Sequence, residues 1–271
     1  MKNYIYIILA SFGVLFTSCE DVIDLELPTA APRLVIEASI DWQKGTTGNE
    51  QRIKITQTTD FYSTSVQAVP GAVVTVSGNG QTFDFIQDAT GDYVCANFAP
   101  ALNETYVLNV LYNGEVYSAS ETLMPSPILE TVIQENDGGF TGEDIELKFT
   151  FQDDGTTDNF YMFKFISPID ILPNYDVVND AFFQGNTMFA FYSDEDLEAN
   201  MEIECSLYGV SETYYNYMNI LLGIAGTNGG SPFQTPPGEV RGNIVNTTTE
   251  TNYPFGFFRL SEVDTKSYTV E

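Results

Sequence analysis

The chain has 271 residues and carries 38 acidic side chains against 10 basic ones, a formal net charge of −28. A protein this acidic is repelled by nucleic acid, because proteins bind nucleic acid mainly through basic contacts to phosphate. The chain contains no histidine, which excludes Ser-His-Asp catalysis, Cys-His catalysis and histidine-ligated zinc sites. We therefore assign no catalytic residue, no metal site and no cofactor, and expect a protein that is not an enzyme.

The first segment of the chain is typical of a bacterial lipoprotein signal peptide. An uncharged run from Tyr4 to Phe16 follows one basic residue. This run is shorter than the about 20 residues that cross a bilayer, and it fits the apolar part of a secretory signal. The small residues Thr17 and Ser18 precede Cys19, and FTSC resembles a lipobox. We expect cleavage of residues 1–18 and lipidation of Cys19. An ordinary signal peptide or a buried helix is the alternative.

Acidic residues follow the cysteine at once, and we expect residues 19–32 to form an acidic tether. Removal of the signal takes away one lysine and no acid, so 9 basic residues would face 38 acidic ones, for a net charge of −29. This charge would hold the body away from anionic lipid. It favours a basic partner surface or cationic ligands, although it also serves solubility alone.

Residues 33–123 show the alternation of short β-strands, as in RLVIEASI and QRIKITQT. Asn79-Gly80 and Asn113-Gly114 each separate two such runs. Asn-Gly favours the type I′ turn of a two-residue hairpin. About seven short strands at regular spacing predict an Ig-like or transthyretin-like β-sandwich.

Two prolines in LMPSPIL, residues 123–129, mark the expected domain boundary, so a second β-rich domain would cover residues 128–271. Strand-like runs precede one helix near residues 211–224, whose N-cap we assign to Ser211. Residues 225–254 are rich in Gly, Pro, Thr and Asn, which predicts a functional or wrapping loop. FGFFRLSEV and KSYTV are expected to form two closing strands. The predicted fold class is mainly β.

Two groups of side chains are candidates for chemistry, and each has a simpler structural interpretation. The acids lack the spacing of a calcium loop, so solvated turns are favoured. Clustered tyrosines could stack on a sugar, but helical spacing favours packing against a core. The residues concerned are Asp153, Asp154, Asp158, Asp194, Glu195, Asp196 and Glu198 among the acids, and Tyr214, Tyr215 and Tyr217.

Cys95 and Cys205 lie in strand-like runs of different predicted domains, so we expect two buried free thiols, although an oxidising compartment would allow a disulfide. Further along, SPFQTPPGEVRGN places Phe233 and two prolines beside Arg241. This segment either docks a partner or runs along the surface, and the sequence does not separate the two. The ligand-binding residues stay unknown.

Several segments, in order, resemble a family of Bacteroidota lipoproteins known as domain of unknown function 4249 (DUF4249). They cover nearly the whole chain after residue 18, and they are CEDVIDLELP, PRLVIEASI, VPGAVVTVSG, TGDYVCANF, ETYVLNVLYNGEVYSASETLMP, SPFQTPPGEVRGNIVN and PFGFFRLS. The resemblance implies an outer-membrane lipoprotein, often encoded beside a TonB-dependent transporter that imports nutrients. Cys19 is the one residue of this sequence that matches a family position of known chemical role. The acids after Cys19 also resemble the signal for export to the outer face of the outer membrane.

These observations predict a lipid-anchored outer-membrane protein that faces the cell exterior. It would act as an accessory or substrate-binding subunit of a TonB-dependent barrel transporter, without catalysis and without a nucleic-acid partner. A structural or adhesive surface lipoprotein is one alternative. A hydrolase that uses two carboxylates is another, because sequence does not give the separation of two carboxylates.

Overall fold

A computed structural model describes residues 31–60, 63, 65–139, 141–225 and 239–271. The predicted signal, Cys19 and nearly all of the predicted tether therefore lie outside the described residues. Pro32–Glu271 forms one compact unit, and 52% of the chain is strand against 6% helix. The protein is mainly β, as predicted.

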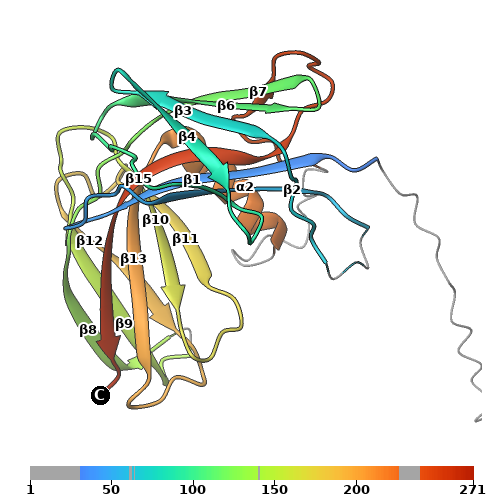
Figure 1. Ribbon diagram of the computed structural model, residues 1–271. Coiled ribbons are helices and arrows are strands. Elements are labelled where there is room, and N and C mark those ends of the chain that lie inside the picture. The colour runs from blue at the N-terminus through green and yellow to red at the C-terminus, as the bar shows by residue number, and fades with distance from the viewer. Residues whose placement is uncertain (1–30, 61–62, 64, 140, 226–238) are drawn as a thin grey trace, which may run out of the picture. The chain divides into compact units, whose positions relative to one another are not determined.

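The described chain forms fifteen strands and the helix α2 (Figure 1). The first seven are β1 (Leu34–Gln43), β2 (Gln51–Gln57), β3 (Val73–Gly78), β4 (Gln81–Gln87), β5 (Tyr93–Cys95), β6 (Thr105–Tyr112) and β7 (Glu115–Thr122). The later elements are β8 (Leu129–Gly138), β9 (Asp144–Gln152), β10 (Phe160–Ile166), β11 (Asn174–Asn179), β12 (Thr187–Ser193), β13 (Glu202–Val210), α2 (Glu212–Ala225), β14 (Val245–Asn246) and β15 (Phe255–Thr269).

The strands form two sheets. The larger has the order β11-β10-β13-β15-β1-β2-β5-β4-β3-β6-β7-β14, and the smaller has the order β12-β9-β8. All pairs are antiparallel except β1 and β15, whose parallel pairing brings the two ends of the described chain together. This pairing closes the fold around strands that are distant in the sequence.

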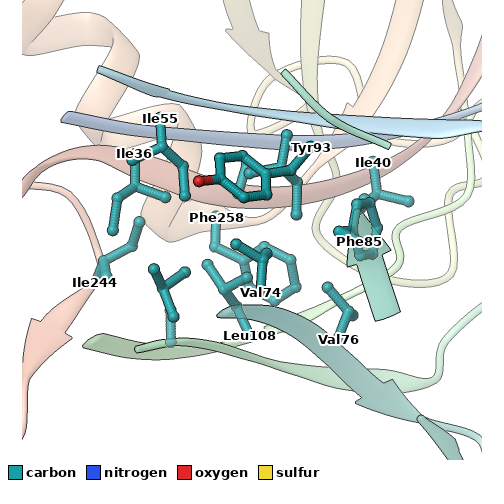
Figure 2. Close-up of a cluster of buried hydrophobic side chains, with 14 of the residues drawn as sticks. Ile36, Ile40, Ile55, Val74, Val76, Phe85, Tyr93, Leu108, Ile244 and Phe258 are labelled. Atoms are coloured by element: carbon teal, nitrogen blue, oxygen red, sulfur yellow. The ribbon is translucent and has the colours of Figure 1, made fainter. Parts of the chain in front are cut away.

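The seven strands β1–β7 form the predicted sandwich. Alternate residues of each strand point inward, so Ile36 of β1 and Ile55 of β2 face Val74 and Leu108 of the opposite layer (Figure 2). Phe258 of β15 completes this core. Because β15 comes from the far end of the chain, the sandwich is not built from residues 33–123 alone.

Both Asn-Gly hairpin predictions are confirmed. Asn79 and Gly80 have φ angles of 49° and 69°, and Asn113 and Gly114 have 50° and 80°. Positive φ at both central positions is the type I′ geometry, whose twist matches that of the flanking strands. These local signals fix the register of β3 with β4 and of β6 with β7.

A second core lies between the small sheet and the strands β10 and β13. Phe149 and Phe151 of β9 meet Phe163 and Phe165 of β10, with the Phe151 and Phe163 ring centroids 5.8 Å apart. Each fully buried aromatic ring removes 150–250 Å² from water, so these rings dominate the energetics of this core. The predicted β-rich C-terminal region is thus a second sandwich.

β15 serves both sandwiches, which corrects the expectation of two closing strands. Its first part pairs with β1 and its last part with β13. Phe258 and Leu260 enter the first core, whereas Val270, just after the strand, enters the second. Phe257 and Val263 point to the other face, beneath α2. A single strand of 15 residues therefore joins the halves that the sequence suggested as separate domains.

The proline-rich segment 123–129 is where the chain passes from one core to the other. It is fastened to the strands that it crosses: Met124 N–H donates to Leu260 O at 3.3 Å, and the Ser126 hydroxyl donates to Leu207 O at 2.9 Å. The segment is held along β15 and β13 rather than spanning open solvent.

The helix α2 covers the face of the sheet opposite the two sandwich cores. The Ser211 hydroxyl accepts the N–H of Tyr214 at 3.2 Å, which confirms Ser211 as the N-cap. Tyr214, Met218 and Leu222 are buried at a spacing of four residues, in a cluster with Phe257. The helix therefore packs one stripe onto the sheet, as its amphipathic pattern predicts.

Candidate functional site

A cavity of about 560 Å³ opens beside β14, at the end of the larger sheet. The described residues that line it all come from one stretch of chain, residues 241–254. The residues that line it are Arg241, Gly242, Ile244, Val245, Asn246, Thr247, Glu250, Tyr253 and Pro254. A volume of this size is in the range that takes a small molecule.

Two residues place Arg241 at the cavity. A Cβ on Gly242 would lie 1.7 Å from the carbonyl oxygen of Gly256, so only glycine allows the two backbones to approach this closely. The side-chain amide of Asn243 donates to Phe258 O and accepts Phe258 N–H, both at 2.9 Å. This pair of bonds imitates strand pairing and fastens the segment to β15.

The opposite wall is held by Asn246. Its Oδ1 accepts the N–H groups of Thr248 and Thr249 at 3.0 and 2.9 Å, and its Nδ2 donates to Asn252 O at 2.8 Å. Thr247 N–H also donates to Val116 O on β7 at 2.8 Å. The loop is therefore preformed, and the Asn246 amide is used up in holding it.

Tyr253 carries two guanidinium groups over its ring. The Cζ of Arg241 lies 3.5 Å from the ring centroid and that of Arg33 lies 4.1 Å from it. Both distances are within the range of a cation–π contact. The Tyr253 hydroxyl donates to Glu239. The stack joins residues from the two ends of the described chain.

Neither Arg33 nor Arg241 forms an ion pair within the described residues, and Arg33 Nη1 is buried there without a hydrogen-bond partner. Lys54, Lys164 and Lys266 likewise form no ion pair within the described ranges. The exposed guanidinium of Arg241 presents a planar donor fork that matches a carboxylate.

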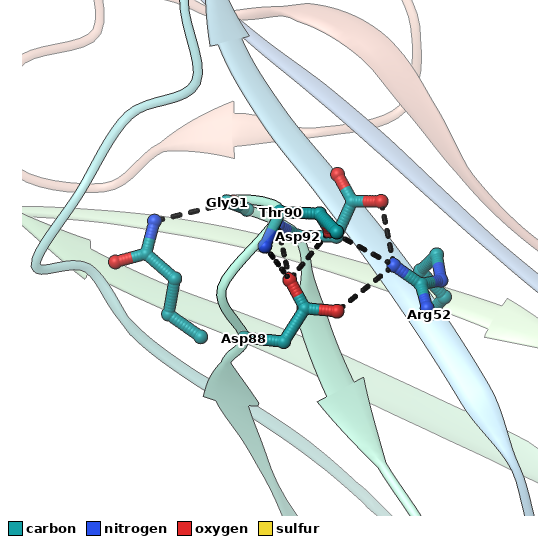
Figure 3. Close-up of polar contacts among 6 residues, drawn as sticks. Arg52, Asp88, Thr90, Gly91 and Asp92 are labelled. Atoms are coloured by element: carbon teal, nitrogen blue, oxygen red, sulfur yellow. Dashed lines mark hydrogen bonds and ion pairs between the residues drawn. The ribbon is translucent and has the colours of Figure 1, made fainter.

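Arg52 on β2, in contrast to Arg33 and Arg241, forms ion pairs with described residues. Its Nη1 lies 3.1 Å from Asp88 Oδ2 and 2.8 Å from Asp92 Oδ2 (Figure 3). The Asp88 carboxylate also accepts the hydroxyl and N–H of Thr90, and these bonds lower the pKa of Asp88. Arg52 is thus engaged with its neighbours, whereas Arg241 lines the cavity and forms no ion pair with the described residues.

The lining of the cavity has a clear chemical character. Ile244, Val245 and Pro254 are apolar, Arg241 is the cation, and Glu250 is the one carboxylate among the lining residues that the structure describes. Because Arg33 and Arg241 both stack on Tyr253, the wall offers a ligand the Arg241 guanidinium and apolar side chains rather than an open aromatic ring.

The acids singled out in the sequence lie elsewhere, and one prediction about them is wrong. Asp153 is only 3% exposed rather than solvated. It accepts the Tyr161 hydroxyl at 2.6 Å and the N–H groups of Gly155 and Gly185 at 3.1 and 2.7 Å. It is buried because it satisfies these three donors. Asp154, next to it, is exposed as expected.

The tyrosines of α2 pack as predicted. Tyr214 meets Phe257 edge to face, with ring centroids 5.0 Å apart, and Tyr217 lies at the same distance from Phe257. Tyr215 packs on Phe160, and its hydroxyl accepts the Asn179 amide at 3.0 Å. The side chains are used in packing the helix onto the sheet.

The two predicted thiols are confirmed as free and buried. Cys95 lies in the first core and Cys205 in the second. Burial raises the pKa of the Cys205 thiol well above its usual range. An apolar surrounding of this kind makes a thiol unreactive.

Of the segment around Arg241, Phe233, Pro236 and Pro237 lie outside the described residues. The sequence did not single out Arg33 or Tyr253. The small number of basic residues in this acidic chain was the one signal in the sequence that pointed to its arginines. Within the described ranges, no cluster of three or more Cys, Asp or Glu side chains is arranged to hold a metal ion, and no helix is long and apolar enough to cross a bilayer.

Comparison with protein families matches the chain to the family described as "Domain of unknown function (DUF4249)" over residues 20–267. The chain belongs to this family. The match begins at the residue after Cys19 and includes every residue of the cavity wall. The family assignment from the sequence is therefore confirmed.

A comparison with curated proteins gives no match. Among solved structures, a segment of two fibronectin type III domains from chicken tenascin is 9% identical, with 66% of this chain and 90% of that chain covered and a TM-score of 0.23. A DUF4785 family protein from Legionella pneumophila is 12% identical, with 65% and 51% covered and a TM-score of 0.24. TM-scores this low carry no inference about the function of this DUF4249 protein.

Proposed function

We propose that this DUF4249 protein is a lipid-anchored outer-membrane lipoprotein that binds a small ligand without catalysis, as an accessory or substrate-binding subunit of a TonB-dependent transporter. The observation that carries the proposal is the preformed cavity at residues 241–254. The Arg241 guanidinium in its wall suits capture and positioning of a ligand.

The anchoring part of the proposal rests on the sequence. FTSC with the acidic residues behind it supports acylation of Cys19 and an address at the outer membrane. Substitution of Cys19 by serine tests this part. The variant should fail to incorporate a labelled fatty acid and should keep the size of the uncleaved precursor. A variant that stays with the membranes at the size of the wild type contradicts the anchor.

The ligand class follows from the wall of the cavity. A ring-shaped molecule with a carboxylate, such as a sugar acid, would pair with Arg241 and contact the exposed side chain of Val245. The alternative of a purely structural or adhesive protein requires no such ligand. Titration calorimetry with uronic acid oligomers, neutral sugar oligomers and short acidic peptides separates the two.

The matched variants are R241A and R52A, because each removes one arginine and only Arg241 lines the cavity. We expect R241A to weaken binding of the acidic ligand by about tenfold or more, since a charge-assisted bond is lost. R52A should bind as the wild type does. Equal affinity in the wild type, R241A and R52A would show that the ligand does not bind in the cavity.

The transporter part has its own test. The protein is purified from detergent-solubilised outer membrane and its partners are identified. A TonB-dependent barrel in stoichiometric amount supports the accessory role, and a transporter gene beside this one supports it further. A protein that purifies without a barrel favours the adhesive alternative.

A further inference from the structure

The edges of the two sheets are protected to very different degrees. A sheet edge presents unpaired N–H and C=O groups, and proteins protect edges by short strands, charges or bulges. In the described part of the chain, β8, β11, β12 and β14 lie at sheet ends. Three of these strands carry such protection, and β12 does not.

Each protected edge uses a different device. β14 has two residues. β8 contains three acids and two shifts of register. On β11, the Asp176 carboxylate accepts the N–H of Val177 at 2.8 Å and so occupies an edge donor. These features prevent further strands from pairing there.

β12 is long, uncharged and free of proline, with the sequence TMFAFYS. It pairs with β9 along one side from Thr187 to Ser193, and no backbone hydrogen bond on its other side is formed by described residues between Met188 and Tyr192. Phe189 and Phe191 point outward and are 49% and 58% exposed. A strand of this kind left open promotes uncontrolled aggregation.

Apolar side chains extend this edge at both ends. Phe182, 93% exposed, and Phe183 lie in the loop that leads into β12. At the other end, Tyr192 donates to Asp170 at 2.9 Å, and the exposed Ile171 and Leu172 follow Asp170 directly. The strand and its two flanks together offer apolar side chains to a partner.

The charges around β12 are nearly all negative. Asp194, Glu195 and Asp196 follow the strand, and Asp170 contacts Tyr192 at its end. Asp154 lies near the start of the strand, because the N–H of the preceding residue, Asp153, donates to Asn186 O. The cation of β9 opposite Phe191 is Lys148, and Glu135 and Glu146 hold it at 2.8 and 3.1 Å. The edge is thus complementary to a basic partner and repels a second copy of this acidic chain.

We propose that β12 is a docking edge for a partner protein, which adds to the small sheet an extended segment of alternating apolar and polar residues with basic residues at both ends. Backbone hydrogen bonds to β12 would supply affinity, as in other cases of strand addition. Phe189 and Phe191 would contact the apolar residues of the segment, and the acids at both ends of β12 would pair with its cations. The edge lies in the small sheet and the cavity beside β14 in the large one, so this proposal stands independently of the proposed ligand.

The test uses the full-length chain in detergent and a synthetic peptide of alternating valine and threonine with lysines at both ends. Binding is measured by fluorescence anisotropy, and hydrogen–deuterium exchange locates the contact. We expect the peptide to bind and to slow exchange at residues 187–193. The same peptide with alternate backbone nitrogens methylated should bind about tenfold more weakly, because it loses donors to the edge.

Two protein variants complete the test. F189K/F191K places charges on the edge and should reduce binding about tenfold or more. L111K makes a similar change on an exposed apolar residue of β6, which lies inside its sheet, and should bind as the wild type does. Equal binding of the methylated peptide, protection outside β12, or a stable dimer of this chain that F189K/F191K dissolves would each overturn the proposal.

Discussion

The carboxylate of Asp41 on β1 lies 2.7 Å from Arg259 Nη2 on β15, and the two charged groups differ sharply in burial. The Arg259 side chain is 5% exposed and that of Asp41 is 43% exposed. Tyr208 and Tyr214 also lie within 4.9 and 5.2 Å of the guanidinium. Although burial disfavours its charge, Asp41 and these rings raise the pKa of Arg259, so it stays charged. Asp41 is therefore the main compensation for a charge buried beneath α2.

Replacing Asp41 by alanine should destabilise the fold more than replacing Arg259 by methionine. Removal of one partner leaves a buried charge uncompensated, which costs about 3–5 kcal/mol for a fully buried pair. Because Asp41 is partly exposed and water screens it, we expect about 2 kcal/mol for D41A. Methionine fills a similar volume and removes the unpaired Nε and Nη1 donors. Urea unfolding of both variants measures the difference, and a smaller loss for D41A than for R259M contradicts this account.

Glu121 should make stability depend on pH. Burial raises the pKa of its carboxyl above the ordinary 4.5, despite hydrogen bonds from Thr122, Ser211 and Asn243. Because the folded-state pKa is the higher one, this contribution to stability is fully present below pH 4.5 and is lost as the pH rises through the folded-state pKa. E121Q keeps an acceptor without the charge.

We therefore expect E121Q to gain stability relative to the wild type above the folded-state pKa, and to match it below pH 4.5. Urea unfolding from below pH 4.5 to above the folded-state pKa measures the stability of E121Q and of the wild type. E130Q, which removes the same charge from an exposed position, serves as the control and should change little with pH. A constant difference between E121Q and the wild type at every pH would contradict the buried-carboxyl explanation.

Asp153 should be required for the second sandwich. D153A leaves the Tyr161 hydroxyl and the N–H groups of Gly155 and Gly185 without their acceptor. Unsatisfied buried donors cost about 1–3 kcal/mol each, so we expect a loss of at least about 3 kcal/mol. D154A changes the neighbouring exposed acid and should stay within about 0.5 kcal/mol of the wild type. Thermal unfolding compares D153A with D154A. Similar midpoints would show that Asp153 behaves as a residue of a solvated turn, as the sequence predicted.

The parts of the fold that sequence reasoning found depend on local signals. Asn79-Gly80 and Asn113-Gly114 dictate their turns whatever surrounds them. The length of β15 was missed because Asp264 and Thr265 separate the two predicted closing strands. Both are half-buried: Asp264 accepts the N–H of Leu129 at 2.7 Å, and the Thr265 hydroxyl donates to the Gln43 side chain at 3.2 Å. Those partners come from distant segments, so no local pattern reveals them.

The cavity was not predicted from the sequence for the same reason. Arg33 and Tyr253 come from opposite ends of the described chain, and only the parallel pairing of β1 with β15 brings them together. Arg241 was singled out by the composition of its segment, but its orientation depends on Gly242 and Asn243. The sequence predicted the strands, whereas the site arises from contacts between strands.

Gly242 offers a sharp test of how the cavity is built. In G242A the new Cβ would lie 1.7 Å from Gly256 O, and Gly256 is itself pressed against Ile36 of β1, so the segment must move. We expect a loss of about 1–3 kcal/mol, as for overpacking elsewhere, together with loss of acidic ligand binding as Arg241 leaves Tyr253. G223A is the control, because a Cβ on Gly223 of α2 meets nothing within 4 Å. Alanine there should stabilise the helix by up to about 1 kcal/mol and leave ligand affinity unchanged. Chemical unfolding and calorimetry measure both variants, and full ligand affinity in G242A would show that Arg241 does not depend on this close approach.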